Sequence, residues 1–124
     1  MSGQLSLAYW NVDGLFKLID GSSECKLSFP SFLSHLTKHV IICLVETHCE
    51  NNNVIQIPGY KLAVNCRSKS PRAWKSFGGL AIAYRDYLHN GVEILPVTST
   101  EFMWMRLKKD QYSRTCNFDV IFHL

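Results

Sequence analysis

Residues 40–48 read Val40-Ile41-Ile42-Cys43-Leu44-Val45-Glu46-Thr47-His48, and this stretch decides the fold. Six apolar residues follow one another and then meet an acid, a hydroxyl and an imidazole. An unbroken apolar run rich in β-branched side chains is typical of a strand covered on both faces, as in a parallel sheet. Ligands of open α/β sheets bind beyond the carboxyl ends of the strands, so Glu46 stands where a metal or phosphate site would form. The alternative is that Glu46 only ends a strand.

A second polar residue, Asn11, directly follows an earlier predicted strand, Leu5–Trp10, just as Glu46 follows the apolar run. The segment Asn11-Val12-Asp13-Gly14 follows that strand, and Asp-Gly is typical of a turn. If the two strands are parallel neighbours, the side chains of Asn11 and Glu46 reach one edge of the sheet.

The segment between the two strands predicts the crossover that parallel neighbours need. Phe29, Phe32, Leu33 and Leu36 recur at i, i+3, i+4 and i+7, which is one face of a helix. Ser28 is the expected N-cap of this helix. Strand, helix and strand then form a βαβ unit. Further strands are predicted at 61–66, 80–85, 92–97, 102–107 and 118–124.

Length and composition bound the class of protein. The chain has 124 residues, 47% of them hydrophobic, and a net charge of +3, which permits a polyanionic partner without requiring one. The sequence has no recognisable signal peptide and no apolar run long enough to span a bilayer. Its five cysteines are scattered and odd in number. We therefore expect reduced thiols in an intracellular protein, nuclear or cytoplasmic and not secreted, with no membrane partner.

The most basic segment is the loop at 67–75. Four cations surround one aromatic residue there: Arg67, Lys69, Arg72 and Lys75 around Trp74. The cations of such a loop are able to bind the phosphates of a nucleic-acid backbone while the indole stacks on a base or sugar. The alternative is a solvated loop with Trp74 folded back on the core. Zinc binding by His35 and His39 is less supported, because no third ligand accompanies them.

Taken together, several segments resemble the endonuclease/exonuclease/phosphatase domain, in particular the apurinic-type endonucleases of non-LTR retrotransposons. The resemblance rests on segments 9–15, 41–48, 58–60, 78–82 and 102–107, which occur in the order of that family and span nearly the whole chain. The resemblance implies an α/β (α+β) fold: a four-layer α/β sandwich with two facing mixed sheets. It also implies Asn11 and Glu46 as metal-binding and catalytic residues, Mg²⁺ as the metal with Mn²⁺ as an alternative, and DNA as partner.

The sequence also departs from that family. The family's remaining catalytic groups are a Tyr in the next strand, an Asp-x-Asn pair and a final Asp-His pair, and none is present. The chain stops inside its last apolar strand, so we expect residues 1–124 to be the N-terminal portion of a truncated domain. That portion is expected to be inactive alone and to associate through its exposed sheet. The alternatives are a phosphatase or sphingomyelinase-like hydrolase of the same fold, and a non-catalytic remnant that acts only as a binding module.

Overall fold

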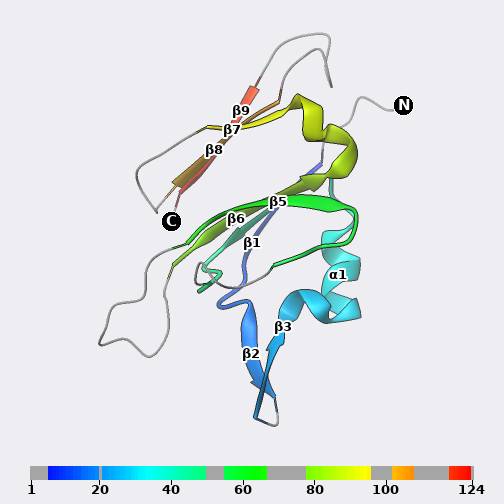
Figure 1. Cartoon of the computed structure of the whole chain (residues 1–124), viewed down its shortest axis with the longest axis vertical. Coiled ribbons are helices and arrows are strands. Elements are labelled where there is room, and N and C mark those ends of the chain that lie inside the picture. The colour runs from blue at the N-terminus through cyan, green and yellow to red at the C-terminus, as the bar shows by residue number, and fades with distance from the viewer. Residues whose placement is uncertain are drawn as a thin grey trace.

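A four-stranded mixed sheet forms the centre of the molecule (Figure 1). The computed structural model describes residues 6–19, 21–49, 55–66, 78–95, 102–107 and 118–123. In sheet order the strands are β1 (Leu7–Asn11), β4 (Ile41–Val45), β6 (Leu80–Arg85) and β5 (Tyr60–Asn65). Strands β1 and β4 run parallel, whereas β6 is antiparallel to both β4 and β5. The predicted parallel pairing of the first strand with the apolar run is therefore confirmed.

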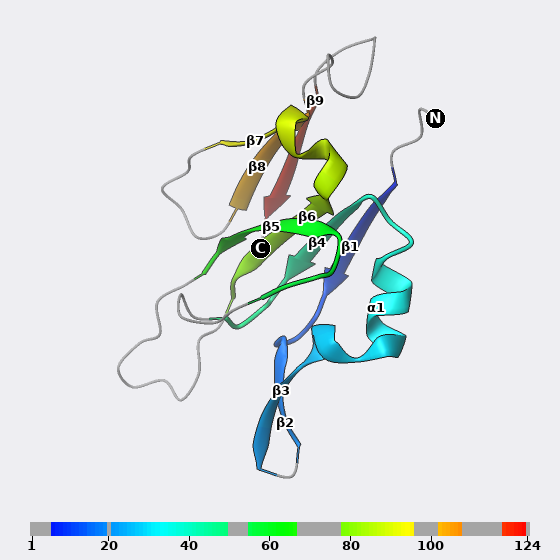
Figure 2. The ribbon, with the colours of Figure 1, turned by 45° about the vertical axis from the view of Figure 1, so that its right-hand side comes forward.

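A second sheet lies on one side of the central sheet (Figures 1 and 2). Its strands, in order, are β7 (Val92–Leu95), β8 (Phe102–Leu107) and β9 (Phe118–His123), and both pairings are antiparallel. A 3₁₀ helix, η2 (Asp86–Gly91), leads from β6 directly into β7. Leu88 and Gly91 of this connection are buried, whereas its other four residues, Asp86, Tyr87, His89 and Asn90, are exposed.

The opposite side of the central sheet is covered by α1 (Pro30–Leu36), as Figure 2 shows. The chain reaches this helix through an antiparallel hairpin and a 3₁₀ turn: β2 (Phe16–Ile19), β3 (Ser22–Cys25) and η1 (Lys26–Ser28). The Trp10 ring of β1 stacks on the Phe32 ring of α1, with the ring centres 4.4 Å apart. The described residues thus form three layers: helix, mixed sheet and antiparallel sheet.

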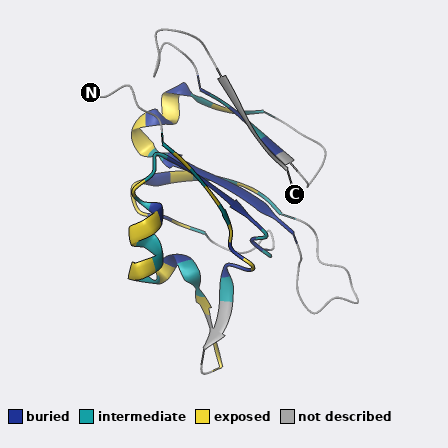
Figure 3. Cartoon of the chain, turned by 180° about the vertical axis from the view of Figure 1, so that it is seen from behind, coloured by how far each residue is buried: buried dark blue, intermediate teal, exposed yellow. Residues whose placement is uncertain are grey.

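Strand β4, which holds residues 41–45 of the apolar run, is buried on both faces because it lies between two cores. Figure 3 shows the strands at the centre of the molecule coloured mostly as buried. Ile42 and Leu44 belong to the core on the helix side. Ile41, Cys43 and Val45 belong to the core against the second sheet. All five residues of β4 are at most 2% exposed, and each fully buried aliphatic side chain contributes roughly 1.5–3 kcal/mol. This burial explains why the run has no polar residue before Glu46.

One sequence-based expectation needs correction at the start of α1. The helix is capped by Phe29, which has an extended backbone and makes no side-chain capping bond, and Ser28 is not the N-cap. The Ser28 hydroxyl instead donates to the Cys25 carbonyl oxygen at 2.7 Å, because Ser28 belongs to the preceding 3₁₀ turn. The β2–β3 hairpin was not predicted, since its segments lack a clear apolar alternation.

The remaining predicted elements agree closely with the structure. The strands at 80–85 and 102–107 are confirmed with their bounds, and the 3₁₀ helix η2 joins the strand at 80–85 to the next predicted strand. No disulfide joins the cysteines of the described ranges, where Cys25, Cys43, Cys49 and Cys66 are all free. Within those same ranges, no helix has the length and apolar character needed to cross a bilayer.

Candidate metal site at the carboxyl edge of the central sheet

Asn11 and Glu46 lie at the same edge of the central sheet. Asn11 is the last residue of β1 and pairs in register with Val45, the last residue of β4. Glu46 is the next residue along the chain. The Val12 amide donates to the Val45 carbonyl oxygen at 3.0 Å, and the Gly14 amide donates to the Glu46 carbonyl oxygen at 2.7 Å. The two strand ends therefore meet as expected, whereas the role of these side chains as metal ligands stays a prediction.

Main-chain hydrogen bonds continue beyond β1 and β4 and join the segments that follow them to the segment that precedes β6. The Leu15 amide donates to the Thr47 carbonyl oxygen at 2.9 Å. On the other side, the Thr47 amide donates to the Gly79 carbonyl oxygen at 3.2 Å, and the His48 amide donates to the Gly78 carbonyl oxygen at 2.8 Å. We call these three bonds, together with those that the Val12 and Gly14 amides donate, the strand-end ladder. It holds residues 46–48 between the loop after β1 and the segment before β6.

Three residues of this region have left-handed backbone conformations that L-amino acids rarely adopt. The φ angles are +47° at Asp13, +55° at Glu46 and +55° at His48. Each such residue costs about 1–3 kcal/mol and persists only where its surroundings impose the conformation. The strand-end ladder supplies that constraint. Concentrated backbone strain of this kind is typical of functional sites.

The Glu46 carboxylate has a defined partner, the His48 imidazole. Glu46 Oε2 lies 3.0 Å from His48 Nε2. The side chain of His48 is 10% exposed and that of Glu46 is 35% exposed, so the carboxylate is the outward member of the pair. This contact was not predicted from the sequence, because the side chains of Glu46 and His48 meet here through the left-handed backbone conformations of both residues.

Asn11 is held by a turn of its own. Its Oδ1 accepts a hydrogen bond from the Asp13 amide at 3.1 Å, which is an Asx turn. The Lys26 ammonium donates to the Val12 carbonyl oxygen at 2.6 Å and fixes the same turn from the helix side. The Asn11 side chain is exposed. Its amide oxygen is thus held in a defined place at the sheet edge.

The donor chemistry of this edge fits a hard cation better than zinc. Asn11 and Glu46 offer an amide oxygen and a carboxylate, and Mg²⁺ prefers oxygen ligands while keeping several waters. A structural zinc site needs about four His, Cys or acidic ligands. No group of three or more such residues is gathered anywhere in the described ranges. Of the two metals, Mg²⁺ is the one whose ligand preference Asn11 and Glu46 would meet, and its binding here stays a prediction.

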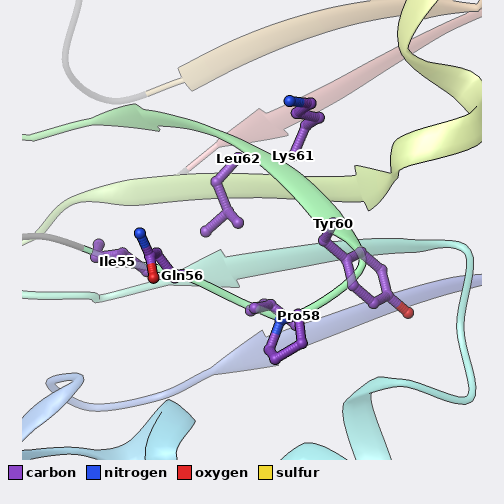
Figure 4. A pocket seen from close by; sticks show the side chains of 7 residues that line it. Ile55, Gln56, Pro58, Tyr60, Lys61 and Leu62 are labelled. Carbon is purple, nitrogen blue, oxygen red and sulfur yellow. The ribbon is translucent and has the colours of Figure 1, made fainter.

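A cavity beside the central sheet lies away from this edge (Figure 4). Its volume is about 350 Å³, and it is open to solvent. The cavity is lined by Ile55, Gln56, Ile57, Pro58, Tyr60, Lys61 and Leu62. It therefore contains neither Asn11 nor Glu46, and its mixed apolar lining offers no carboxylate or imidazole. At the strand-end site, Asn11 is exposed and the Glu46 side chain is 35% exposed.

The predicted nucleic-acid contacts, Arg67, Lys69, Arg72, Trp74 and Lys75, lie outside the described residues. The basic loop therefore stays a prediction. Comparison with known proteins adds no identity: no protein-family model matches the chain, and neither the curated proteins nor the solved structures contain a match.

Proposed function

We propose that this chain is the N-terminal portion of a magnesium-dependent endonuclease domain of the endonuclease/exonuclease/phosphatase type, which nicks DNA when complete. The observation that carries the proposal is the meeting of Asn11 and Glu46 at the carboxyl edge of two parallel central strands. The sequence resemblance assigns the metal to the same two residues. The layers of helix and two sheets support the proposal as well, because such layers are part of a four-layer α/β sandwich, although the described pairings of the second sheet are antiparallel and not mixed.

The two residues account for only part of phosphodiester cleavage. A bound Mg²⁺ would orient a phosphate and offset the charge that develops on its oxygens. Cleavage also needs an oriented nucleophilic water and a leaving oxygen that is stabilised. The groups that supply these functions in the resembling family are absent from this sequence. Catalytic groups that act as a unit lose most of their effect when members are missing, so the chain alone is proposed to be inactive.

An exposed apolar strip favours a second function, binding of a partner without catalysis. Leu7 is 44% exposed and Tyr9 is 62% exposed. Both pair in register with Ile41 and Cys43, which face the second sheet, so the strip continues that face along β1. A self-association or partner-binding role for this strip does not require a metal, and this difference separates the two proposals.

Magnesium titration followed by ¹H–¹⁵N NMR tests the proposed metal site. We expect Mg²⁺ to shift the amide signals of residues 11–14 and 46–48 in the wild type, and these shifts to be much smaller in Glu46→Gln at the same Mg²⁺ concentration. Glu24→Gln is the matched control, because Glu24 is an exposed acid on β3 outside the strand-end ladder. Equal shifts in the wild type and in Glu46→Gln would show that Glu46 merely ends a strand.

A further inference from the structure

We propose that His48 is a positioning residue, which fixes the Glu46 carboxylate in the orientation that binds the metal ion. This inference rests on the proposed function for the identity of the ion. The contact itself is a feature of the structure, with 3.0 Å between Nε2 of His48 and Oε2 of Glu46.

The imidazole lies behind the carboxylate and is fixed by its own surroundings. A Cβ atom at Gly14 would lie 3.1 Å from His48 Nδ1 and 3.8 Å from His48 Cγ, so the ring packs directly on the Gly14 backbone. Gly14 has a φ of +86°, and its amide donates to the Glu46 carbonyl oxygen. The glycine therefore accommodates the ring and also holds the main chain of the residue that the ring contacts.

The two side chains of the pair differ in their exposure to solvent. His48 has 10% of its side chain exposed, whereas Glu46 has 35%, so the carboxylate faces solvent and the ring does not. A carboxylate has about four lone-pair directions on two oxygens. The contact at Oε2 therefore leaves Oε1 available to an ion. Hydrogen-bonded partners of metal-binding carboxylates are worth 10–100-fold in metal affinity.

The backbone explains why a positioning partner matters here. Glu46 leaves the strand in a left-handed conformation, so its side chain no longer follows the alternation of β4. The pleat of the sheet does not fix where its carboxylate lies. His48 has the same left-handed conformation two residues later, and the two turns bring its ring back to the carboxylate.

Mn²⁺ binding to the whole chain, measured by electron paramagnetic resonance of the free ion, tests the proposal. Mn²⁺ takes the same oxygen ligands as Mg²⁺. We expect His48→Leu to weaken Mn²⁺ binding by about 10-fold or more. His48→Gln is expected to restore most of the affinity, because its amide nitrogen reaches roughly the place of Nε2. The shorter His48→Asn is expected to bind as weakly as His48→Leu. His35→Leu, on the exposed face of α1, is the matched control.

A double-mutant cycle separates positioning from direct metal binding. If His48 acts through Glu46, His48→Leu has no further effect in a Glu46→Gln background. A further loss in that background would make His48 a ligand and overturn the proposal. Unchanged affinity in Glu46→Gln alone would overturn both the metal site and the role of His48. Weakened binding in Glu46→Gln with full binding in His48→Leu would overturn only the positioning role. If His48→Leu fails to fold, equal affinities of the Gln and Asn variants would overturn it.

Discussion

Replacing Gly79 by alanine tests how tightly the strand-end ladder is packed. Gly79 has a φ of +92°, and a Cβ atom there would lie 2.3 Å from Thr47 Oγ1. Thr47 is 1% exposed, and its hydroxyl has no hydrogen-bond partner among the described residues. The added methyl group would thus meet a buried group on the residue between Glu46 and His48.

The expected loss of stability has two parts. A left-handed backbone costs an alanine about 1–2 kcal/mol. Overpacking of a close contact costs about 1–3 kcal/mol more. We therefore expect Gly79→Ala to lower the free energy of unfolding by roughly 2–5 kcal/mol, which is a large share of the stability of a small domain. Gly21→Ala isolates the first part, because Gly21 has a φ of +82° and nothing within 4 Å of its added Cβ.

Urea denaturation of four proteins measures both parts: the two glycine variants, Thr47→Ala, and the double variant Gly79→Ala/Thr47→Ala. Thr47→Ala removes the Oγ1 atom, after which the nearest neighbour of the new Cβ is the His48 amide nitrogen at 3.5 Å. Removing a buried hydroxyl that lacks a partner is close to neutral. We expect the double variant to recover about 1–3 kcal/mol and to match Gly21→Ala. Equal losses in Gly79→Ala and Gly21→Ala would refute the close packing.

Four further outcomes are expected. Glu46→Gly relieves the backbone at φ +55° and should raise the free energy of unfolding by about 1 kcal/mol in urea, and Glu46→Ala should give no such gain. Burial raises the pKa of the Cys49 thiol from 9.0 to about 12. The unfolded chain therefore releases this proton before the folded one does, so stability should fall as pH rises above 9.0. The fall should be shallower in Cys49→Ala, and identical pH slopes would contradict the assignment. Replacing the four cations of loop 67–75 by serine should flatten the log–log salt dependence of DNA binding by roughly four units, and an unchanged slope would remove that loop from the interface. The wild-type chain with Mg²⁺ should not nick supercoiled plasmid, and nicking that disappears in Glu46→Ala would show a working enzyme.

The parts of the fold that were predictable are those decided by burial. The run at 40–45 has no polar residue because both of its faces lie in a core. An unbroken apolar run of this kind can be recognised from the sequence alone. The placement of Asn11 and Glu46 followed from the same reasoning, because polar residues that end two parallel neighbours share an edge. Local pattern and strand topology were sufficient for both.

The parts that were not predictable depend on contacts between distant segments. The β2–β3 hairpin turns at Gly21, and its strands carry no alternation that separates them from a loop. The pairing of His48 with Glu46 requires two left-handed residues that the strand-end ladder imposes. The fit of Thr47 against Gly79 depends on the register of β4 with β6, in which Val45 pairs with Leu80. No local pattern in the sequence specifies any of these three features.

The strand-end ladder is made of main-chain atoms only, and this has a consequence for the evolution of the site. Its donors and acceptors are amides and carbonyl oxygens of residues 12–15, 45–48 and 78–79. Substitution of the side chains at Asn11 or Glu46 leaves all of these bonds in place. The backbone of this edge and the side chains that it displays are therefore separable: the same edge is able to present a different set of side chains while the backbone stays unchanged.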